Sequence, residues 1–277
     1  MLNHVQITVT SLQPEQRDVL IAQLAEAGYE GFEETESELK AFITESNYDK
    51  ASLHELAFRY QLSYTEQLIP EQNWNETWES NFHPVMIDDF VQGTPWIAIR
   101  ADFHEPIKEV EHEIVITPKM SFGTGHHATT FMMVQQIRTI AFDSKSVFDF
   151  GTGTGVLAIL AEKLGAVDVL AIDNDDWSIT NAEENIQRND CNRIRLKKAN
   201  DAITDEQYDI ILANINKNVI LDNFSSLVRQ LAPKGTLLLS GLLLEDEADI
   251  LAETRKYPLI LNGKTTDRGW ICLRFNY

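Results

Sequence analysis

The sequence has little cysteine and no long apolar run. Cys191 and Cys272 are its two cysteines, and they lie far apart without a metal-ligand spacing. They provide no disulfide framework and fit a reducing compartment, so we expect packing roles for both. No apolar stretch approaches the roughly 18 residues that span a bilayer, and the opening MLNHVQITVT lacks the pattern of a signal peptide. We therefore expect a soluble, cytoplasmic protein with no membrane partner and no bound metal.

Basic residues are also scarce. The 277 residues include 23 lysines and arginines against 43 acidic residues, a net charge of −20 that is spread along the chain. This balance disfavours direct binding to a nucleic acid backbone and would attract a basic protein partner. The acidity can equally serve solubility alone.

The length suggests about two domains. Residues 1–68 predict the order β-α-β-β-α-β, which is the order of a small ferredoxin-like α+β domain. The expected elements are strand His4 to Thr10, helix Pro14 to Ala27, strands Gly31 to Thr35 and Leu39 to Thr44, helix Tyr48 to Tyr60, and strand Ser63 to Leu68. None of these elements carries a catalytic pattern.

Residues 69–81 form a polar joining segment with two tryptophans. Trp74 and Trp78 are four residues apart, which is compatible with a short helix between two domains. Packing at a domain junction is favoured for both side chains over covering a ligand.

Residues 82–277 predict an α/β domain. Short strands, including Trp96 to Ala101 and Ile114 to Ile116, come before a regular alternation of helices and strands. Such alternation is typical of a doubly wound parallel sheet with helices on both faces. Two final strands, Pro258 to Leu261 and Gly269 to Phe275, lack room for a crossover helix and should be antiparallel neighbours. The alternating elements are helix Thr130 to Ala141, strand Val147 to Phe150, helix Val156 to Leu164, strand Asp168 to Ile172, helix Ser178 to Asn189, strands Ile194 to Lys198 and Tyr208 to Ala213, helix Val219 to Leu231, strand Thr236 to Ser240 and helix Asp246 to Lys256.

The stretch VFDFGTGTGVLAIL contains the strongest functional signal. An apolar strand leads into Gly151, Gly153 and Gly155, and a helical pattern follows at once. Glycines allow the sharp reversal and the close approach of a ligand to the backbone, next to free N–H groups at the helix start. Asp173 ends the next strand, where its carboxylate can accept hydrogen bonds from a ribose diol. These features predict a cofactor that contains a nucleoside.

The spacing of the glycines and the last two strands narrow the choice of cofactor. A dinucleotide fingerprint reads G-x-G-x-x-G, whereas this chain has G-x-G-x-G followed by Val156. The terminal antiparallel pair resembles the seven-stranded fold of S-adenosylmethionine-dependent methyltransferases, in which Asp149 would belong to the first cofactor motif. A nicotinamide dehydrogenase fits less well.

Three separated stretches carry a more specific resemblance: FGTGHHATT at 122–130, DFGTGTGVLAILAEKLGA at 149–166 and ILANIN at 211–216. Together with NWNETWESNFHP and LLLSGLLLED, they make nearly the whole chain similar to the bacterial ribosomal protein L11 methyltransferase family. Two departures stand out. His126, His127 and Ala128 replace the usual Thr-His-Pro, and the run from Thr152 to Thr154 replaces the frequent Cys-Gly-Ser.

The resemblance implies S-adenosylmethionine as cofactor and a basic ribosomal protein as substrate, methylated on lysine side chains and on the N-terminal α-amine. It implies that the first domain recognises this protein. We expect the chain to be a monomer. The resemblance also assigns cofactor contacts to Thr130, Gly151, Asp173 and Asn214, and Gly153 joins them because a glycine lets the backbone approach the methionine portion. Our hypothesis is that the Asn214 carbonyl and nearby backbone carbonyls orient the acceptor amine, with its proton lost to water. Two alternatives stay open, a methyltransferase for another protein or a small molecule, and a cofactor-binding module without catalysis.

Local reasoning adds independent expectations for two of these residues. Thr130 lies at a predicted helix start, where its hydroxyl would serve as the cap unless it binds the cofactor. Asn214 follows a buried strand at the carboxyl end of the sheet, where ligands of doubly wound folds bind. His126 or His127 is a less favoured proton acceptor.

Overall fold

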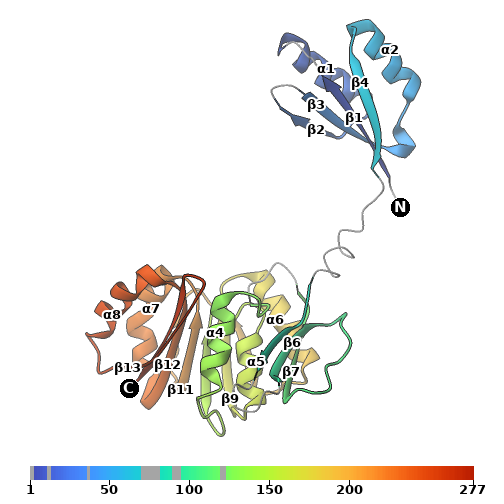
Figure 1. Cartoon of the computed structure of the whole chain (residues 1–277). Helices are drawn as coiled ribbons and strands as arrows, with labels where there is room; N and C mark the ends of the chain where they lie inside the picture. The colour runs from blue at the N-terminus through green and yellow to red at the C-terminus, as the bar shows by residue number, and fades with distance from the viewer. Residues whose placement is uncertain (1–2, 11–13, 36–37, 70–81, 89–94, 119–122) are drawn as a thin grey trace. The chain divides into compact units, whose positions relative to one another are not determined.

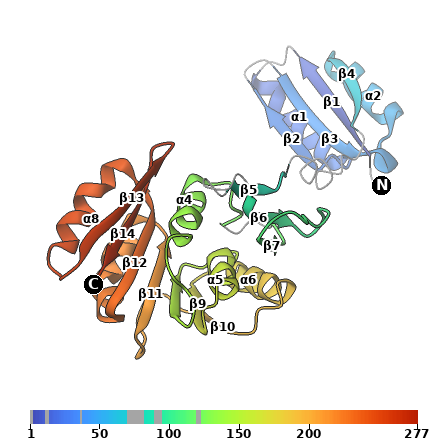
Figure 2. The same ribbon diagram turned by 60° about the horizontal axis from the view of Figure 1, so that its bottom comes forward.

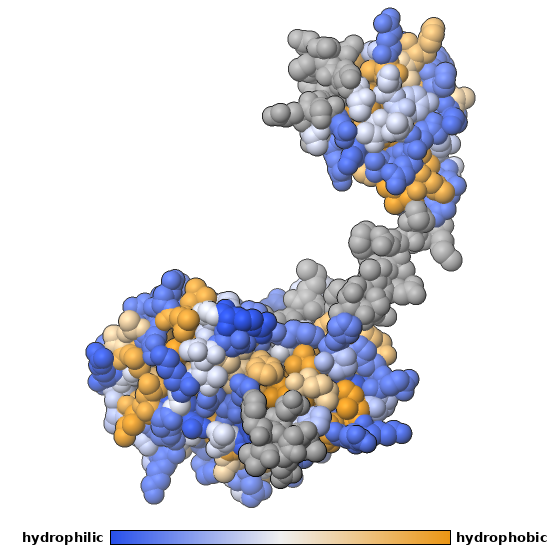
Figure 3. Space-filling model, in the orientation of Figure 1, coloured by the Kyte–Doolittle hydropathy of each residue, from blue (hydrophilic) through white to orange (hydrophobic). Residues whose placement is uncertain are grey.

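The computed structural model describes residues 3–10, 14–35, 38–69, 82–88, 95–118 and 123–277. The chain folds into two compact units, Met1–Asn81 and Phe82–Tyr277 (Figure 1). The expected joining helix, with Trp74 and Trp78, lies outside the described residues. Within each unit, hydrophilic side chains cover much of the face drawn in Figure 3.

The first unit is a four-stranded antiparallel sheet with helices. The strand order is β2-β3-β1-β4, and inward residues such as Ile7 and Leu39 are completely buried. Helix α2 begins at Lys50, not at Tyr48, because the Asp49 carboxylate caps it by accepting from the Ala51 N–H at 2.9 Å. The elements are β1 (His4–Thr10), α1 (Pro14–Glu26), β2 (Gly31–Glu34), β3 (Glu38–Thr44), the 3-10 turn η1 (Glu45–Asn47), α2 (Lys50–Tyr60) and β4 (Ser63–Ile69).

The second unit contains a seven-stranded sheet in the order β10-β9-β8-β11-β12-β14-β13 (Figure 2). The first five strands are parallel, and β14 and β13 are added antiparallel, as predicted from the missing crossover helix. The strands are β8 (Ser146–Phe150), β9 (Asp168–Asp173), β10 (Ile194–Lys198), β11 (Tyr208–Asn214), β12 (Leu231–Leu243), β13 (Ile260–Asp267) and β14 (Trp270–Asn276).

Helices cover both faces of this sheet. Alternate strand residues point to opposite faces, so Val147 packs with one layer of helices and Phe148 with the other. The layer on the Val147 side is α4 (Ala128–Ile137), α5 (Val156–Lys163) and α6 (Asp176–Arg188), and the layer on the Phe148 side is α7 (Lys217–Arg229) and α8 (Glu247–Thr254), which follows the 3-10 turn η2 (Leu244–Asp246). The doubly wound α/β prediction is confirmed. Among the described residues, no helix is both long enough and apolar enough to cross a membrane.

A separate three-stranded sheet precedes the large one in the chain. It consists of β5 (Val85–Asp88), β6 (Pro95–Ala101) and β7 (His112–Ile116), with β5 antiparallel and β7 parallel to β6. Its apolar side, including Ile97 and Ile114, belongs to the same core as α4, α5 and α6. The small sheet and the large sheet of the second unit therefore share one hydrophobic interior.

Candidate functional site

Chemistry-bearing residues meet at the carboxyl ends of β8, β9 and β11. Neighbouring parallel strands place the glycine turn, Asp173 and Asn214 side by side, and a cavity of about 360 Å³ opens among them. Its walls are formed by His127, Thr129, Gly151, Gly153, Asp173, Ser178, Asn214, Ile215, Asn216, Gly241 and Trp270. Four of the five predicted site residues line this cavity, and the fifth, Thr130, lies behind Asn214.

The glycine turn adopts a backbone that other residues resist. Gly151, Gly153 and Gly155 have φ of +79°, +55° and +81°, in the left-handed region. The N–H groups of Gly151 and Thr152 both donate to the Ile172 carbonyl, at 3.0 and 2.9 Å, and so fasten the turn to β9. The backbone of the turn thus stays exposed to the cavity and rigidly placed.

Asp173 links the turn to the next helix. One carboxylate oxygen accepts from the Gly153 N–H at 2.9 Å, and the other accepts from the Asp175 N–H at 3.1 Å. Each carboxylate oxygen can accept a second hydrogen bond. The side chain is therefore fixed in place and retains acceptor capacity toward the cavity.

Asp149, expected as part of a cofactor motif, lies beneath the turn and is completely buried. One of its oxygens accepts from the Thr152 hydroxyl at 2.6 Å, and the other has no hydrogen-bond partner. Burial raises the pKa of this carboxyl to about 7, and the nearby Asp173 charge acts in the same direction. Asp149 supports the turn from below and does not line the cavity.

Thr130 does not cap α4, contrary to the local expectation. The helix begins at Ala128, and the His127 ring caps it by accepting from the Thr129 N–H. The Thr130 hydroxyl is instead fully buried and accepts from the Asn214 side-chain N–H at 3.2 Å. This bond fixes the amide of Asn214, whose side-chain oxygen is buried without a hydrogen-bond partner.

The two histidines hold structural positions. The His127 ring packs edge-on against Trp270 at 4.8 Å between centroids, and burial, with a smaller contribution from Arg268, lowers its pKa. His126 lies outside the cavity lining, with Nε2 2.8 Å from the His83 carbonyl and Nδ1 3.2 Å from the Thr124 hydroxyl. Neither ring is placed as an obvious base.

Sequence reasoning missed several lining residues, above all Gly241 and Trp270. Gly241 has φ of +79°, and a Cβ there would lie 2.5 Å from the Ile215 carbonyl oxygen. It sits in the stretch LLLSGLLLED, where a glycine interrupting an apolar strand is the signal for a close backbone approach. Trp270 reaches the cavity through the β12–β14 pairing, which no local pattern reveals.

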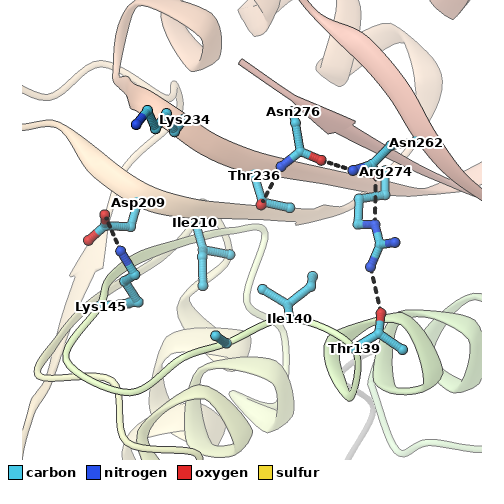
Figure 4. A pocket seen from close by; sticks show the side chains of 11 residues that line it. Thr139, Ile140, Lys145, Asp209, Ile210, Lys234, Thr236, Asn262, Arg274 and Asn276 are labelled. Carbon is cyan, nitrogen blue, oxygen red and sulfur yellow. Dashed lines mark hydrogen bonds and ion pairs between the residues drawn. The ribbon is translucent and has the colours of Figure 1, made fainter.

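A second cavity, of about 280 Å³, lies at the opposite end of the sheet, where β8, β11 and β12 begin (Figure 4). Most of its polar groups bond to one another. Lys145 pairs with Asp209 at 3.0 Å, and Arg274 donates to Thr139 and Asn262. These contacts are self-contained, so the candidate site is the cavity at the carboxyl ends of the strands. Among the described residues, no group of three or more histidine, cysteine or acidic side chains could hold a metal ion.

Comparison with known proteins agrees with this geometry. A family model for ribosomal protein L11 methyltransferases matches residues 3–277. The protein named ribosomal protein L11 methyltransferase in Porphyromonas gingivalis is 39% identical, over 93% of this chain and 90% of the relative. The protein of the same name in Chlorobaculum tepidum is 38% identical, over 88% of this chain and 86% of the relative. The crystal structure of a ribosomal protein L11 methylase from Lactobacillus delbrueckii subsp. bulgaricus superposes with a TM-score of 0.63 at 30% identity, over 70% of this chain and 98% of that one. The chain belongs to the ribosomal protein L11 methyltransferase family.

Proposed function

We propose that the cavity binds S-adenosylmethionine and that the protein transfers methyl groups to amino groups of ribosomal protein L11, on lysine side chains and on the N-terminal α-amine. The observation that carries this proposal is the side-chain oxygen of Asn214. It is a buried acceptor without a partner, on a cavity wall shared with Asp173 and the glycine turn. Buried acceptors normally have a donor, so this oxygen calls for an N–H group from outside the chain.

The residues present fit the cofactor. The Asp173 carboxylate, already held by two N–H groups, can accept from both hydroxyls of a ribose, in bonds to a charged group of about 1.5–3 kcal/mol each. Gly151 and Gly153 let the methionine portion approach the backbone, and Gly241 leaves room where a side chain would strike Ile215. Thr130 acts indirectly, by holding the amide of Asn214.

The reaction needs a neutral amine in line with the methyl group. When bound, the sulfonium supplies a methyl group that is already activated. Asn214 accepts an N–H from the incoming amine and so turns the nitrogen lone pair toward the methyl group. This contribution is a positioning effect. The fixed amide loses little freedom on binding, because Thr130 already holds its other end.

Removal of the amine proton distinguishes the two kinds of acceptor. A lysine with a pKa of about 10.4 costs roughly 4 kcal/mol to neutralise near pH 7.4, whereas an α-amine with a pKa of about 8 costs less than about 1 kcal/mol. The His127 ring lines the cavity, but its Nδ1 already accepts from the Thr129 N–H, so we assign the proton to water. The α-amine is therefore the easier acceptor.

Recognition of the protein substrate is assigned to the first domain, residues 1–68, with 69–81 as a linker and 82–277 as the catalytic domain. The net charge of −20 suits a basic ribosomal protein and opposes direct contact with nucleic acid. Such a substrate places the reaction in the cytoplasm. Deletion of residues 1–68 should abolish methylation of the protein while cofactor binding persists.

The test is the intact mass of purified ribosomal protein L11 after incubation with this protein and S-adenosylmethionine. Stepwise gains of one methyl group are expected, and Asn214→Ala should slow them at least about 100-fold, on the scale of a lost catalytic hydrogen bond. Asn218→Ala, an exposed asparagine at the start of α7, is the matched control. An unchanged mass with the wild-type protein contradicts the proposed function. An unchanged rate with Asn214→Ala contradicts the assigned role of Asn214 alone.

A further inference from the structure

Helix α6 and its C-cap residue place three asparagines on the buried side of the helix, at intervals of four residues. Asn181 and Asn185 are completely buried and Asn189 is 9% exposed. We call them the asparagine ladder. Asparagine is a weak helix former, and buried amides are costly without partners, so three of them on one face require an explanation.

The ladder bonds to the backbone of β7 and of the residue that follows it. Asn189 accepts from the Val115 N–H at 3.0 Å and donates to the Val115 carbonyl at 2.7 Å. Asn185 accepts from the Thr117 N–H at 2.7 Å, and Asn181 donates to the Thr117 carbonyl at 3.0 Å. In both views of the fold, α6 lies beside β7 (Figures 1 and 2).

The spacing explains why a helix can do this. Four helical residues advance by about 6 Å, and two strand residues advance by about 6.6 Å. Val115 and Thr117 are two apart and present their free groups on the same edge of β7, away from β6. The amides of α6 therefore take the place of a neighbouring strand.

Asn185 has a second connection that Asn189 lacks. Its side-chain N–H donates to the Thr154 carbonyl at 2.8 Å, inside the glycine turn. The Thr154 hydroxyl in turn donates to the Gly123 carbonyl at 2.8 Å. Asn185 thus joins the end of β7, the glycine turn and the residues that lead into α4.

We propose that Asn185 is a positioning residue for the cofactor cavity, acting through the Thr154 peptide. The bond to the Thr154 carbonyl fixes the orientation of the turn between Gly153 and Gly155, and so the Gly153 N–H that is bonded to Asp173. The Asn189 side chain bonds to Val115 in β7 and to the Asn185 carbonyl within its own helix, and makes no bond to the glycine turn. This inference rests on the proposed binding of S-adenosylmethionine and adds a residue that lies outside the cavity lining.

The experiment compares Asn185→Ala with Asn189→Ala in the full chain. Asn185→Ala removes the bonds to Thr117 and Thr154, and Asn189→Ala removes two bonds to Val115 and one to the Asn185 carbonyl, so both should lower the urea midpoint. Asn185→Ala should raise the Kd for S-adenosylmethionine, measured by calorimetry, and the KM for it by about tenfold, with kcat at saturation within about twofold. Asn189→Ala should leave Kd and KM within about twofold. A purely structural role would lower the active fraction, and hence kcat, in both variants without this difference in KM.

Equal cofactor affinity in the two variants overturns the proposal. If Asn185→Ala fails to fold, Asn185→Asp keeps an acceptor for the Thr117 N–H but removes the amide donor to the Thr154 carbonyl, so it should raise KM in the same way. Asn185→Asp with wild-type KM also overturns the proposal. Failure of the wild-type protein to bind S-adenosylmethionine would instead refute the proposed function, so the two failures are distinguishable.

Discussion

Replacement of Asp149 by asparagine should stabilise the second unit increasingly as the pH rises. The carboxyl is completely buried beneath the glycine turn, and its pKa is raised from 3.8 to about 7, mainly by burial. An amide of the same shape can still accept from the Thr152 hydroxyl. It never ionises, so it removes the cost of a buried charge.

The sign and size follow from linkage between proton binding and folding. Because the pKa of Asp149 is higher in the folded state, folding favours the protonated form, and this stabilisation is complete below the unfolded value of about 3.8. It is lost as the pH rises through about 7. One pKa unit corresponds to 1.36 kcal/mol, so the full change is about 4 kcal/mol, of which about 2.5 kcal/mol falls between pH 5 and pH 8.

The assay is urea unfolding of both proteins at several pH values, followed by circular dichroism. The difference in free energy of unfolding, Asp149→Asn minus wild type, should grow between pH 5 and about pH 7 and become constant above it. Use of the difference cancels the other carboxylates, several of which have lowered pKa values and act in the opposite direction. A difference that does not change with pH would show that Asp149 titrates as an ordinary carboxyl and refute the reasoning.

Three further outcomes are expected. Gly241→Ala should weaken binding of S-adenosylmethionine and lower the thermal midpoint, because the new Cβ meets the Ile215 backbone at a positive φ; calorimetry and a melting curve check both effects. His127→Ala should cost about 0.5–2 kcal/mol in urea unfolding, since the cap of α4 is lost, and no loss would show that the ring is dispensable as a cap. Arg195→Ala should cost less than about 1 kcal/mol, although this arginine pairs with two carboxylates, because the three side chains are about half exposed; a larger loss in the same measurement would contradict surface screening.

Local patterns predicted the larger sheet well. Strand Ile194–Lys198 was predicted to the residue, because an apolar alternation ends there in polar residues. The short connection before Gly269 was enough to predict that the last two strands are antiparallel neighbours. Strand β12 is longer than expected, running from Leu231 to Leu243, because its pairing with β14 continues past an irregularity between Leu239 and Leu242. Tertiary pairing of this kind leaves no local signal.

The site residues that could be predicted are those that stand at the ends of predicted strands. Gly151 and Gly153 follow strand β8, and Asp173 and Asn214 end strands β9 and β11, so all four lie at one edge of the sheet, at positions that the sequence pattern predicts. The position of Thr130 behind Asn214 depends on contact between α4 and β11, residues 84 apart in the chain. The asparagine ladder had a sequence signal, because its three asparagines stand at helical intervals in a predicted helix. The residues that they bind lie 68 and 74 positions away in the chain, so the sequence did not reveal the partner strand.

The asparagine ladder also bears on association between molecules. An uncovered strand edge offers a row of free N–H and carbonyl groups on which another chain can add a strand. The amides of α6 occupy these groups at Val115 and Thr117, on the outer edge of β7. Loss of the ladder would do more than loosen the fold, since it would uncover a strand edge on which another chain can pair.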